Sequence, residues 1–145
     1  MMTLEELSDI EEIKSVRVRY SLYYDGGELD KLVELFCDDA VCEFPAEFGG
    51  DWRGKEQIRE NFKRWVKPQG QRFSALHALA NARVTLTGKD TAIGQAYLID
   101  LHTGEELAMP VHLVGLYDDA YERTAGGWRL KRARLDVLWP RRSAP

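Results

Sequence analysis

Cysteine is scarce in this sequence: Cys37 and Cys42 are the only two cysteines among 145 residues. They lie five positions apart, without a CxxC pair or a histidine at the spacing of a metal site. The pattern therefore predicts neither a disulfide framework nor a zinc site. We expect two reduced thiols in a cytoplasmic protein. Cys42 is a poor candidate nucleophile, because the neighbouring Glu43 opposes formation of a thiolate.

The sequence also lacks an excess of positive charge and any long apolar run. Its 20 Lys and Arg against 24 Asp and Glu give a net charge of −4, which disfavours binding to nucleic acid or to anionic lipid. No stretch approaches the ~18 apolar residues that a membrane span requires. The opening residues, MMTLEE, are acidic where a signal peptide is basic and then apolar. We expect a soluble protein that has neither a nucleic acid nor a membrane as partner.

Four motifs of common enzyme classes are absent. The sequence contains no GxGxxG, no P-loop motif, no GxSxG and no HExxH. Dinucleotide binding, P-loop chemistry, α/β-hydrolase chemistry and zinc peptidase chemistry therefore have no local support. We expect a function that uses no cofactor and no metal.

The first half of the chain carries helical spacing. Thr3 and Glu6 form a capping-box pair, and apolar or aromatic residues then recur every three or four positions. This predicts a long helix that ends near Asp25, where two consecutive glycines suit a helix C-terminus. The same spacing predicts a short helix over residues 29–36 and a third helix over residues 55–66.

The second half of the chain alternates with the period of two that is typical of strands. Turn signals divide it into segments covering about residues 72–87, 91–101, 107–122 and 128–139. Strands joined by short turns pair antiparallel, so we expect a meander of these four segments. Residues 41–44 are expected to add an edge strand.

Helices followed by a sheet indicate the α+β class. With 44% hydrophobic residues, 145 positions supply one core, so we expect one domain over residues 1–145 with a loose tail at residues 141–145. The expected architecture is a cone-shaped, curved antiparallel sheet wrapped around the N-terminal helices. Such a cone leaves an apolar pocket at its open end, and polar residues inside it would carry the chemistry.

Asp25 and His77 are the first candidates for that chemistry. Asp25 lies at the C-terminal end of the long helix, where the helix dipole disfavours a negative charge unless a cation or a histidine answers it. His77 lies in the apolar run ALHAL. Each residue also has a structural reading, Asp25 as a turn aspartate and His77 as a satisfied core histidine. As a pair, the aspartate would orient the imidazole and make it a general base.

Further candidates lie on the later strands. Asp100 and His102 share one strand face, and alternation alone does not separate them or exclude an exposed turn. His112 is expected to pack in the sheet rather than act in catalysis. On the last strand, Arg132 belongs to a basic run that is typical of a solvated face, unless a bulge turns one arginine inward. Asn81 shares a face with His77, so the strand is expected to bend near Ala80 or to end in a polar cavity.

Several short motifs occur in a familiar order: RY at 19–20, YD at 24–25, LFCDDA at 35–40, WRGKEQI at 52–58, His77 with Asn81, GLYDDAYER at 115–123 and GGWRL at 126–130. Over about residues 4 to 139 this order resembles the SnoaL-like branch of the nuclear transport factor 2-like superfamily, a group of cystatin-like folds. The resemblance is closest to the scytalone dehydratase, bile acid 7α-dehydratase and lindane dehydrochlorinase group.

The resemblance implies roles for individual residues. In these lyases an aspartate at the end of the first helix holds a histidine on a strand, and the histidine removes a proton while a leaving group departs; Asp25 and His77 match these positions. Tyr24 resembles a tyrosine that polarises the substrate through water. Asp100 falls near an additional aspartate of one relative and His102 near a second histidine of another, so both remain candidates.

The chain also departs from the lindane dehydrochlorinase pattern. Tyr20 replaces a lysine on the first helix, and the strand arginine falls on Ala133, with Arg132 and Arg134 on either side. Release of a halide is therefore not expected.

Together these observations predict a cofactor-independent lyase, a dehydratase of a small cyclic or aromatic hydroxylated substrate. The alternatives are an isomerase or polyketide-type cyclase with the same dyad, and a noncatalytic module that binds a small ligand or dimerises. The expected substrate contacts are Tyr20, Phe44, Trp65, Asn81 and Arg132. We also expect a homo-oligomer, a dimer or trimer, because Leu113, Gly115, Tyr117 and the basic last strand favour association between sheets.

Overall fold

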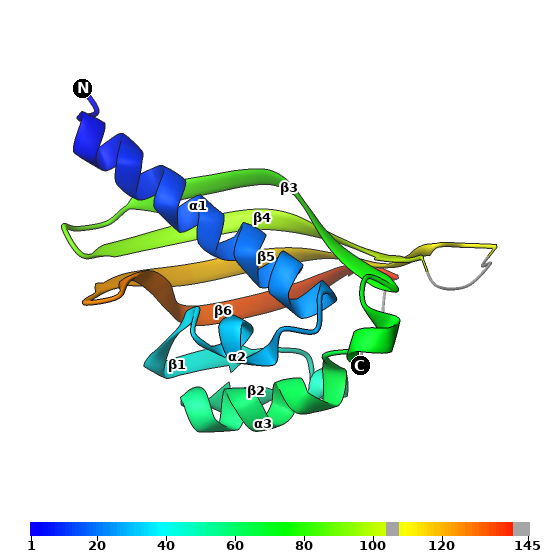
Figure 1. Cartoon of the computed structure of the whole chain (residues 1–145). Helices are drawn as coiled ribbons and strands as arrows, with labels where there is room; N and C mark the ends of the chain where they lie inside the picture. The colour runs from blue at the N-terminus through cyan, green and yellow to red at the C-terminus, as the bar shows by residue number, and fades with distance from the viewer. Residues whose placement is uncertain (104–107, 141–145) are drawn as a thin grey trace.

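The computed structural model describes residues 1–103 and 108–140, and the predicted tail at 141–145 lies outside this range. The elements follow in the order α1 (Leu4–Asp25), α2 (Leu29–Val33), β1 (Phe36–Glu43), a 3-10 turn (Ala46–Phe48), β2 (Asp51–Arg53), α3 (Lys55–Trp65), a second 3-10 turn (Gln69–Gln71), β3 (Ala75–Leu86), β4 (Thr91–His102), β5 (Val111–Thr124) and β6 (Gly127–Trp139). The predicted α+β class is confirmed (Figure 1). The second helix is shorter than predicted, because Phe36 already belongs to β1.

The six strands form one mixed sheet in the order β2-β1-β6-β5-β4-β3. All pairs are antiparallel except β1 with β6, which run parallel. The prediction of a wholly antiparallel sheet is therefore wrong at this pair, and β1 is an inner strand rather than an edge strand. Parallel neighbours are joined by a long crossover, here most of the chain, and local turn signals do not reveal such a pairing.

Helix α1 crosses one face of the sheet and contacts β3 and β6, whereas α3 contacts β1 and β2 (Figure 1). The predicted capping box starts α1: the Glu6 amide donates to Thr3 Oγ1, and the Thr3 amide donates to Glu6. The core between helices and sheet takes side chains from every layer, among them Ile13, Val16, Leu32, Phe36, Ile58, Leu98 and Leu130. Within the described residues, no helix is both long and apolar enough to cross a membrane.

Bulges decide which strand residues face the helices. In β3, Asn81 adopts φ 55° and the pairing shifts between Ala80 and Arg83, so the strand bends as expected there. In β6 the extra residue is Lys131, because Ala120 pairs with Arg132 and Tyr121 with Leu130. After this bulge the buried position is Ala133.

Three of the residues on which the prediction of self-association rested do not face outward. Leu113 and Tyr117 are buried and line the inner face of β5, and Gly115 is buried on the same face. The outer face of the sheet instead exposes Ile93 and Tyr97 of β4. The alternation along β5 was correct, but the sequence did not say which of its two faces met the helices.

Candidate active site

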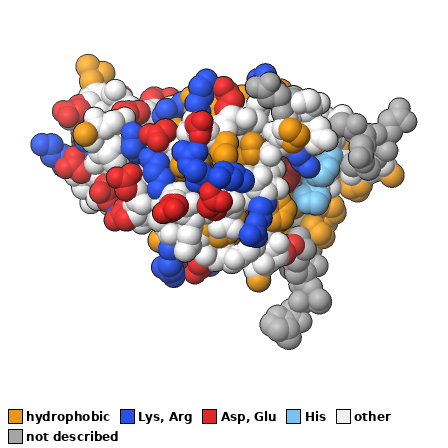
Figure 2. Space-filling model, turned by 60° about the horizontal axis from the view of Figure 1, so that its bottom comes forward, with side chains coloured by type: hydrophobic (Ala, Val, Ile, Leu, Met, Phe, Trp, Pro, Cys, Tyr) orange, Lys and Arg blue, Asp and Glu red, His pale blue; other side chains and the backbone are white. Residues whose placement is uncertain are grey.

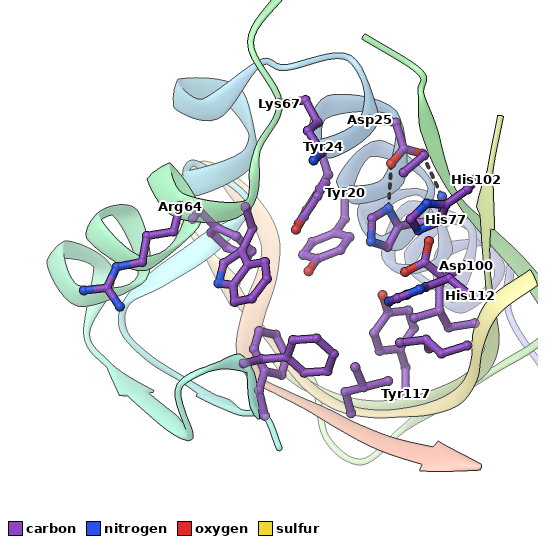
Figure 3. A pocket seen from close by; sticks show the side chains of 18 of the residues that line it. Tyr20, Tyr24, Asp25, Arg64, Lys67, His77, Asp100, His102, His112 and Tyr117 are labelled. Carbon is purple, nitrogen blue, oxygen red and sulfur yellow. Dashed lines mark hydrogen bonds and ion pairs between the residues drawn. The ribbon is translucent and has the colours of Figure 1, made fainter. Parts of the chain in front are cut away.

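A cavity of about 330 Å³ opens between the helices and the inner face of the sheet. Its volume falls in the range of about 300–1,000 Å³ that is usual for small-molecule sites. The largest group of lining residues is aromatic: Tyr20, Tyr24, Phe44, Phe48, Trp52, Phe62, Trp65 and Tyr117. The other lining residues are four aliphatic ones, Ala75, Leu98, Leu113 and Leu135, and a polar set of Asp25, Arg64, Lys67, His77, Asp100, His102 and His112 (Figure 3).

Asp25 and His77 are joined by two hydrogen bonds inside this cavity. One Asp25 oxygen lies 2.6 Å from His77 Nδ1, and the other accepts from the His77 backbone N–H at 2.8 Å (Figure 3). The Asp25 side chain is 6% exposed and the His77 side chain 12%. Because Nδ1 faces the carboxylate, the opposite ring nitrogen, Nε2, is the one that can accept a proton from a ligand.

The end of α1 and the start of β3 together hold Asp25 and His77 in position. Asp25 is the last residue of α1, and its backbone carbonyl accepts from the Phe73 amide at 2.8 Å, which anchors the start of β3 beside the helix end. The helix dipole disfavours a carboxylate at the C-terminus of α1, and the two hydrogen bonds from His77 compensate for this unfavourable interaction. The pairing therefore uses both oxygens of Asp25 and fixes the imidazole ring.

Tyr24 lies against the dyad. Its ring centroid is 4.3 Å from that of His77, and the Tyr20 ring lies 6.5 Å from the imidazole, edge to face. Burial raises the pKa of the Tyr24 phenol well above its usual range, with smaller contributions from Tyr117, Asp100 and Asp25. The phenol therefore stays protonated and can donate a hydrogen bond to an oxygen in the cavity.

Asp100 faces His77 from the neighbouring strand, since the two residues are paired across β3 and β4. Its Oδ1 is buried and has no hydrogen-bond partner. Burial raises the pKa of this carboxyl, and the three histidines only partly oppose that shift. Asp100 therefore holds its proton to a higher pH than an exposed aspartate, as a proton donor requires.

His102 and His112 lie together at the cavity mouth, with ring centroids 4.6 Å apart. The sequence did not decide whether Asp100 or His102 enters the cavity, and in the structure both residues line it. The expectation that His112 packs in the sheet is wrong: it is exposed, and the β4–β5 pairing skips it between Val111 and Leu113. The sequence did contain one sign of this irregular pairing: Pro110 has no backbone N–H to donate, so it cannot continue a regular pairing of strands.

The other expected substrate contacts divide into two groups. Tyr20, Phe44 and Trp65 line the cavity, whereas Asn81 and Arg132 do not. Asn81 is the bulge residue of β3 and borders a different hollow between α1 and the sheet. The bulge in β6 brings Arg132 near Asp118 and Glu43 instead, at 3.7 and 3.9 Å.

A buried ion pair that the sequence did not single out supports the cavity floor. Arg17 donates from Nε and Nη2 to both carboxylate oxygens of Asp119, at 2.8 and 2.7 Å, and Tyr121 donates to the same carboxylate at 3.1 Å. The guanidinium carbon lies 3.5 Å from the Tyr117 ring centroid and 4.5 Å from that of Tyr20. The available signal was Arg17 on the apolar stripe of α1.

Two other kinds of chemistry find little support in the site. Burial raises the pKa of the Cys42 thiol well above its usual range, which disfavours a thiolate nucleophile. In the part of the chain that the structure describes, no three His, Cys, Asp or Glu side chains are grouped so as to hold a metal ion.

The chain is similar to known proteins in both its sequence and its fold. A family model described as a SnoaL-like domain matches residues 5–134. An uncharacterized protein of Mycobacterium tuberculosis, Rv2910c, is 31% identical over 134 residues, which cover 91% of this chain and 87% of the relative. Among solved structures, a candidate scytalone dehydratase from Novosphingobium aromaticivorans aligns with a TM-score of 0.80 at 18% identity, covering 94% and 89% of the two chains. LinA aligns with a TM-score of 0.75 at 18% identity, covering 98% and 97%.

Proposed function

The chain belongs to the SnoaL-like domain family, and we propose that it is a cofactor-independent lyase that removes water from a small cyclic or aromatic hydroxylated molecule. The observation that carries this proposal is the Asp25–His77 pair, hydrogen-bonded at 2.6 Å inside a cavity walled by aromatic rings. The likeness in fold to a candidate scytalone dehydratase and to LinA agrees with it.

The proposed reaction is an elimination. His77 Nε2 takes a proton from a substrate carbon, the electron pair of that C–H bond forms a carbon–carbon double bond, and the C–O bond of the neighbouring hydroxyl breaks. The departing hydroxyl takes a proton from Asp100 and leaves as water, while Tyr24 donates a hydrogen bond to a substrate oxygen. Asp25 stabilises the imidazolium that forms. The proton on His77 then returns to Asp100 through water, which restores both groups.

Product mass tests the proposal against its closest alternative. An isomerase or cyclase with the same dyad would move a proton and keep every atom of the substrate. We expect mass spectrometry of a panel of hydroxylated aromatic and alicyclic compounds to show the loss of one water from at least one of them. A product of unchanged mass would indicate an isomerase or cyclase instead of a lyase. If no compound were converted, a noncatalytic binding module would be favoured.

The pH dependence tests the role of Asp100. We expect turnover to decline as pH rises through the raised pKa of Asp100, because the carboxyl then loses the proton that it donates. In Asp100→Asn the rate falls about 10²-fold or more, the usual cost of losing a general acid, and this decline disappears. His102→Gln is the matched variant, and it keeps the decline. Full activity of Asp100→Asn with an unchanged pH profile would assign the proton donor to another group.

We also propose that the protein is a homo-oligomer that associates through the outer face of the sheet. Ile93 is 49% exposed and Tyr97 is 43% exposed on this face. Arg134 and Asp136, both about half exposed, add charges of opposite sign that a symmetric contact can pair. Light scattering is expected to give at least twice the chain mass, and Tyr97→Arg is expected to lower it. A monomeric mass for the unaltered protein would contradict this proposal.

A further inference from the structure

The charged groups that line the cavity differ in their exposure to solvent. Its buried negative charge is the Asp25 carboxylate, which lies on the wall beside His77 and is engaged by two hydrogen bonds, whereas the neighbouring Asp100 carboxyl is protonated in the proposed reaction. Its two permanent cations, Arg64 and Lys67, come from the end of α3 and the segment that follows, and both are exposed. A ligand in the cavity therefore meets a negative charge that is already hydrogen-bonded at the dyad and positive charges that are exposed to solvent.

Within residues 1–103 and 108–140, these two cations differ from most other lysines and arginines in having no ion-pair partner. Of the seven lysines, five pair with carboxylates: Lys14, Lys31, Lys55, Lys63 and Lys131. Lys67 and Lys89 form no ion pair with any described residue, and the same holds for Arg64. Lys89 lies at the turn between β3 and β4, outside the cavity lining. Lys67 is thus the one lysine that is both unpaired, within the described residues, and part of the cavity wall.

The direction of the side chains distinguishes the two cations. In Figure 3 the Lys67 side chain extends from the rim toward the tyrosines, whereas the Arg64 side chain extends away from them. The histidine pair instead lies beside His77 and Asp100 in Figure 3, and Figure 2 shows histidine side chains exposed among apolar ones at one end of the molecule. Lys67 is therefore the cation best placed to meet a group on a ligand that fills the aromatic part of the cavity.

We propose that the substrate carries an anionic substituent, a carboxylate or a phosphate, which Lys67 binds at the mouth while the ring system lies against the aromatic wall. This inference rests on the proposed function, since it names the class of substrate for the same cavity. The anion is held by Lys67 and kept from the negative charge of Asp25, so that the uncharged part of the molecule lies against the aromatic wall and the dyad. Lys67 acts as a residue that selects and orients the substrate.

A set of matched ligands tests the charge preference without requiring turnover. Calorimetry at neutral pH and low salt would compare 2-naphthoate and 2-naphthyl phosphate with the neutral 2-naphthamide. We expect at least one anion to bind about five-fold more tightly than the amide, the effect of a partly exposed ion pair, and added salt to reduce the preference. The anion with the larger preference identifies the group as carboxylate or phosphate.

Two lysine variants complete the experiment. Lys67→Gln is expected to remove most of the preference for the anion while it leaves the affinity for the amide unchanged, and Lys89→Gln is expected to change neither. Equal binding of anions and amide, or a preference that survives in Lys67→Gln, would overturn the inference and leave the dyad untouched. Binding of none of the ligands would overturn it as well. Loss of activity in His77 variants is a separate measurement, so a failure of the proposed lyase function is distinguished from a failure of this inference.

Discussion

Replacing His77 by alanine is expected to lower turnover of the substrate by about 10²–10⁴-fold, the range found when a general base is removed. The physical reason is that, among the described residues that line the cavity, no other group has a nitrogen hydrogen-bonded to a buried carboxylate, as His77 is to Asp25 at 2.6 Å. The assay is the mass-spectrometric loss of water described above. The fold should persist, because the His77 side chain occupies a cavity wall rather than the closed core.

Comparison with two other variants separates the dyad from a general effect on the cavity. His112→Ala removes an imidazole from the same cavity that does not touch Asp25, and we expect a much smaller loss. Asp25→Asn keeps the shape of the side chain but removes its charge, and its effect should not add to that of His77→Ala, since the two residues act as a unit. Turnover by His77→Ala within a few-fold of the unaltered protein would end the assignment of His77 as the base.

The largest expected effect on stability comes from Asp119→Asn. This change leaves the Arg17 charge buried, at 4% side-chain exposure, without its counter-charge. Breaking a buried ion pair by removing one partner costs about 3–5 kcal/mol. Urea unfolding should therefore show a midpoint far below that of the unaltered protein with a similar slope. Because Arg17 stacks on Tyr117 and Tyr20, the same variant should also weaken ligand binding in the cavity.

An exposed ion pair provides the control for this measurement. Lys131 Nζ lies 2.5 Å from Asp39 Oδ2 at the surface, where solvent screens the interaction. Asp39→Asn should therefore change the free energy of unfolding little. If the midpoint of Asp119→Asn were no lower than that of Asp39→Asn, the buried pair would contribute no more than a surface pair. The double replacement Arg17→Met with Asp119→Leu is expected to recover part of the loss, because no unpaired charge then remains in the core.

The sequence predicted those helices and strands that are determined by residues close together in the chain. The capping box of Thr3 and Glu6 and the spacing behind it predicted α1, and the alternation of period two predicted β3 to β6 to within a few residues at most ends. The juxtaposition of Asp25 and His77 was also anticipated, because a carboxylate at a helix C-terminus needs a donor and the motif order resembles that of lyases with such a pair.

Features that depend on distant segments were not predictable in this way. The parallel pairing of β1 with β6 joins residues separated by most of the chain, and no turn signal reports it. Bulges shift the alternation by one residue, which is why His112 enters the cavity mouth while Arg132 does not. The Arg17–Asp119 pair spans 102 positions, and although Arg17 stands out on the apolar stripe of α1, nothing local identifies Asp119 as its partner.

The central claim is that Asp25 holds His77 with Nδ1 protonated and Nε2 free to act as the base. Nitrogen-15 NMR of the histidine rings, in the pH range where the imidazoles are neutral, reads this directly. The account predicts for His77 a proton on Nδ1 and none on Nε2, a pattern that Asp25→Asn alters while the signals of His102 and His112 stay in place. A proton on Nε2 of His77, or a His77 spectrum that Asp25→Asn leaves unchanged, would contradict it.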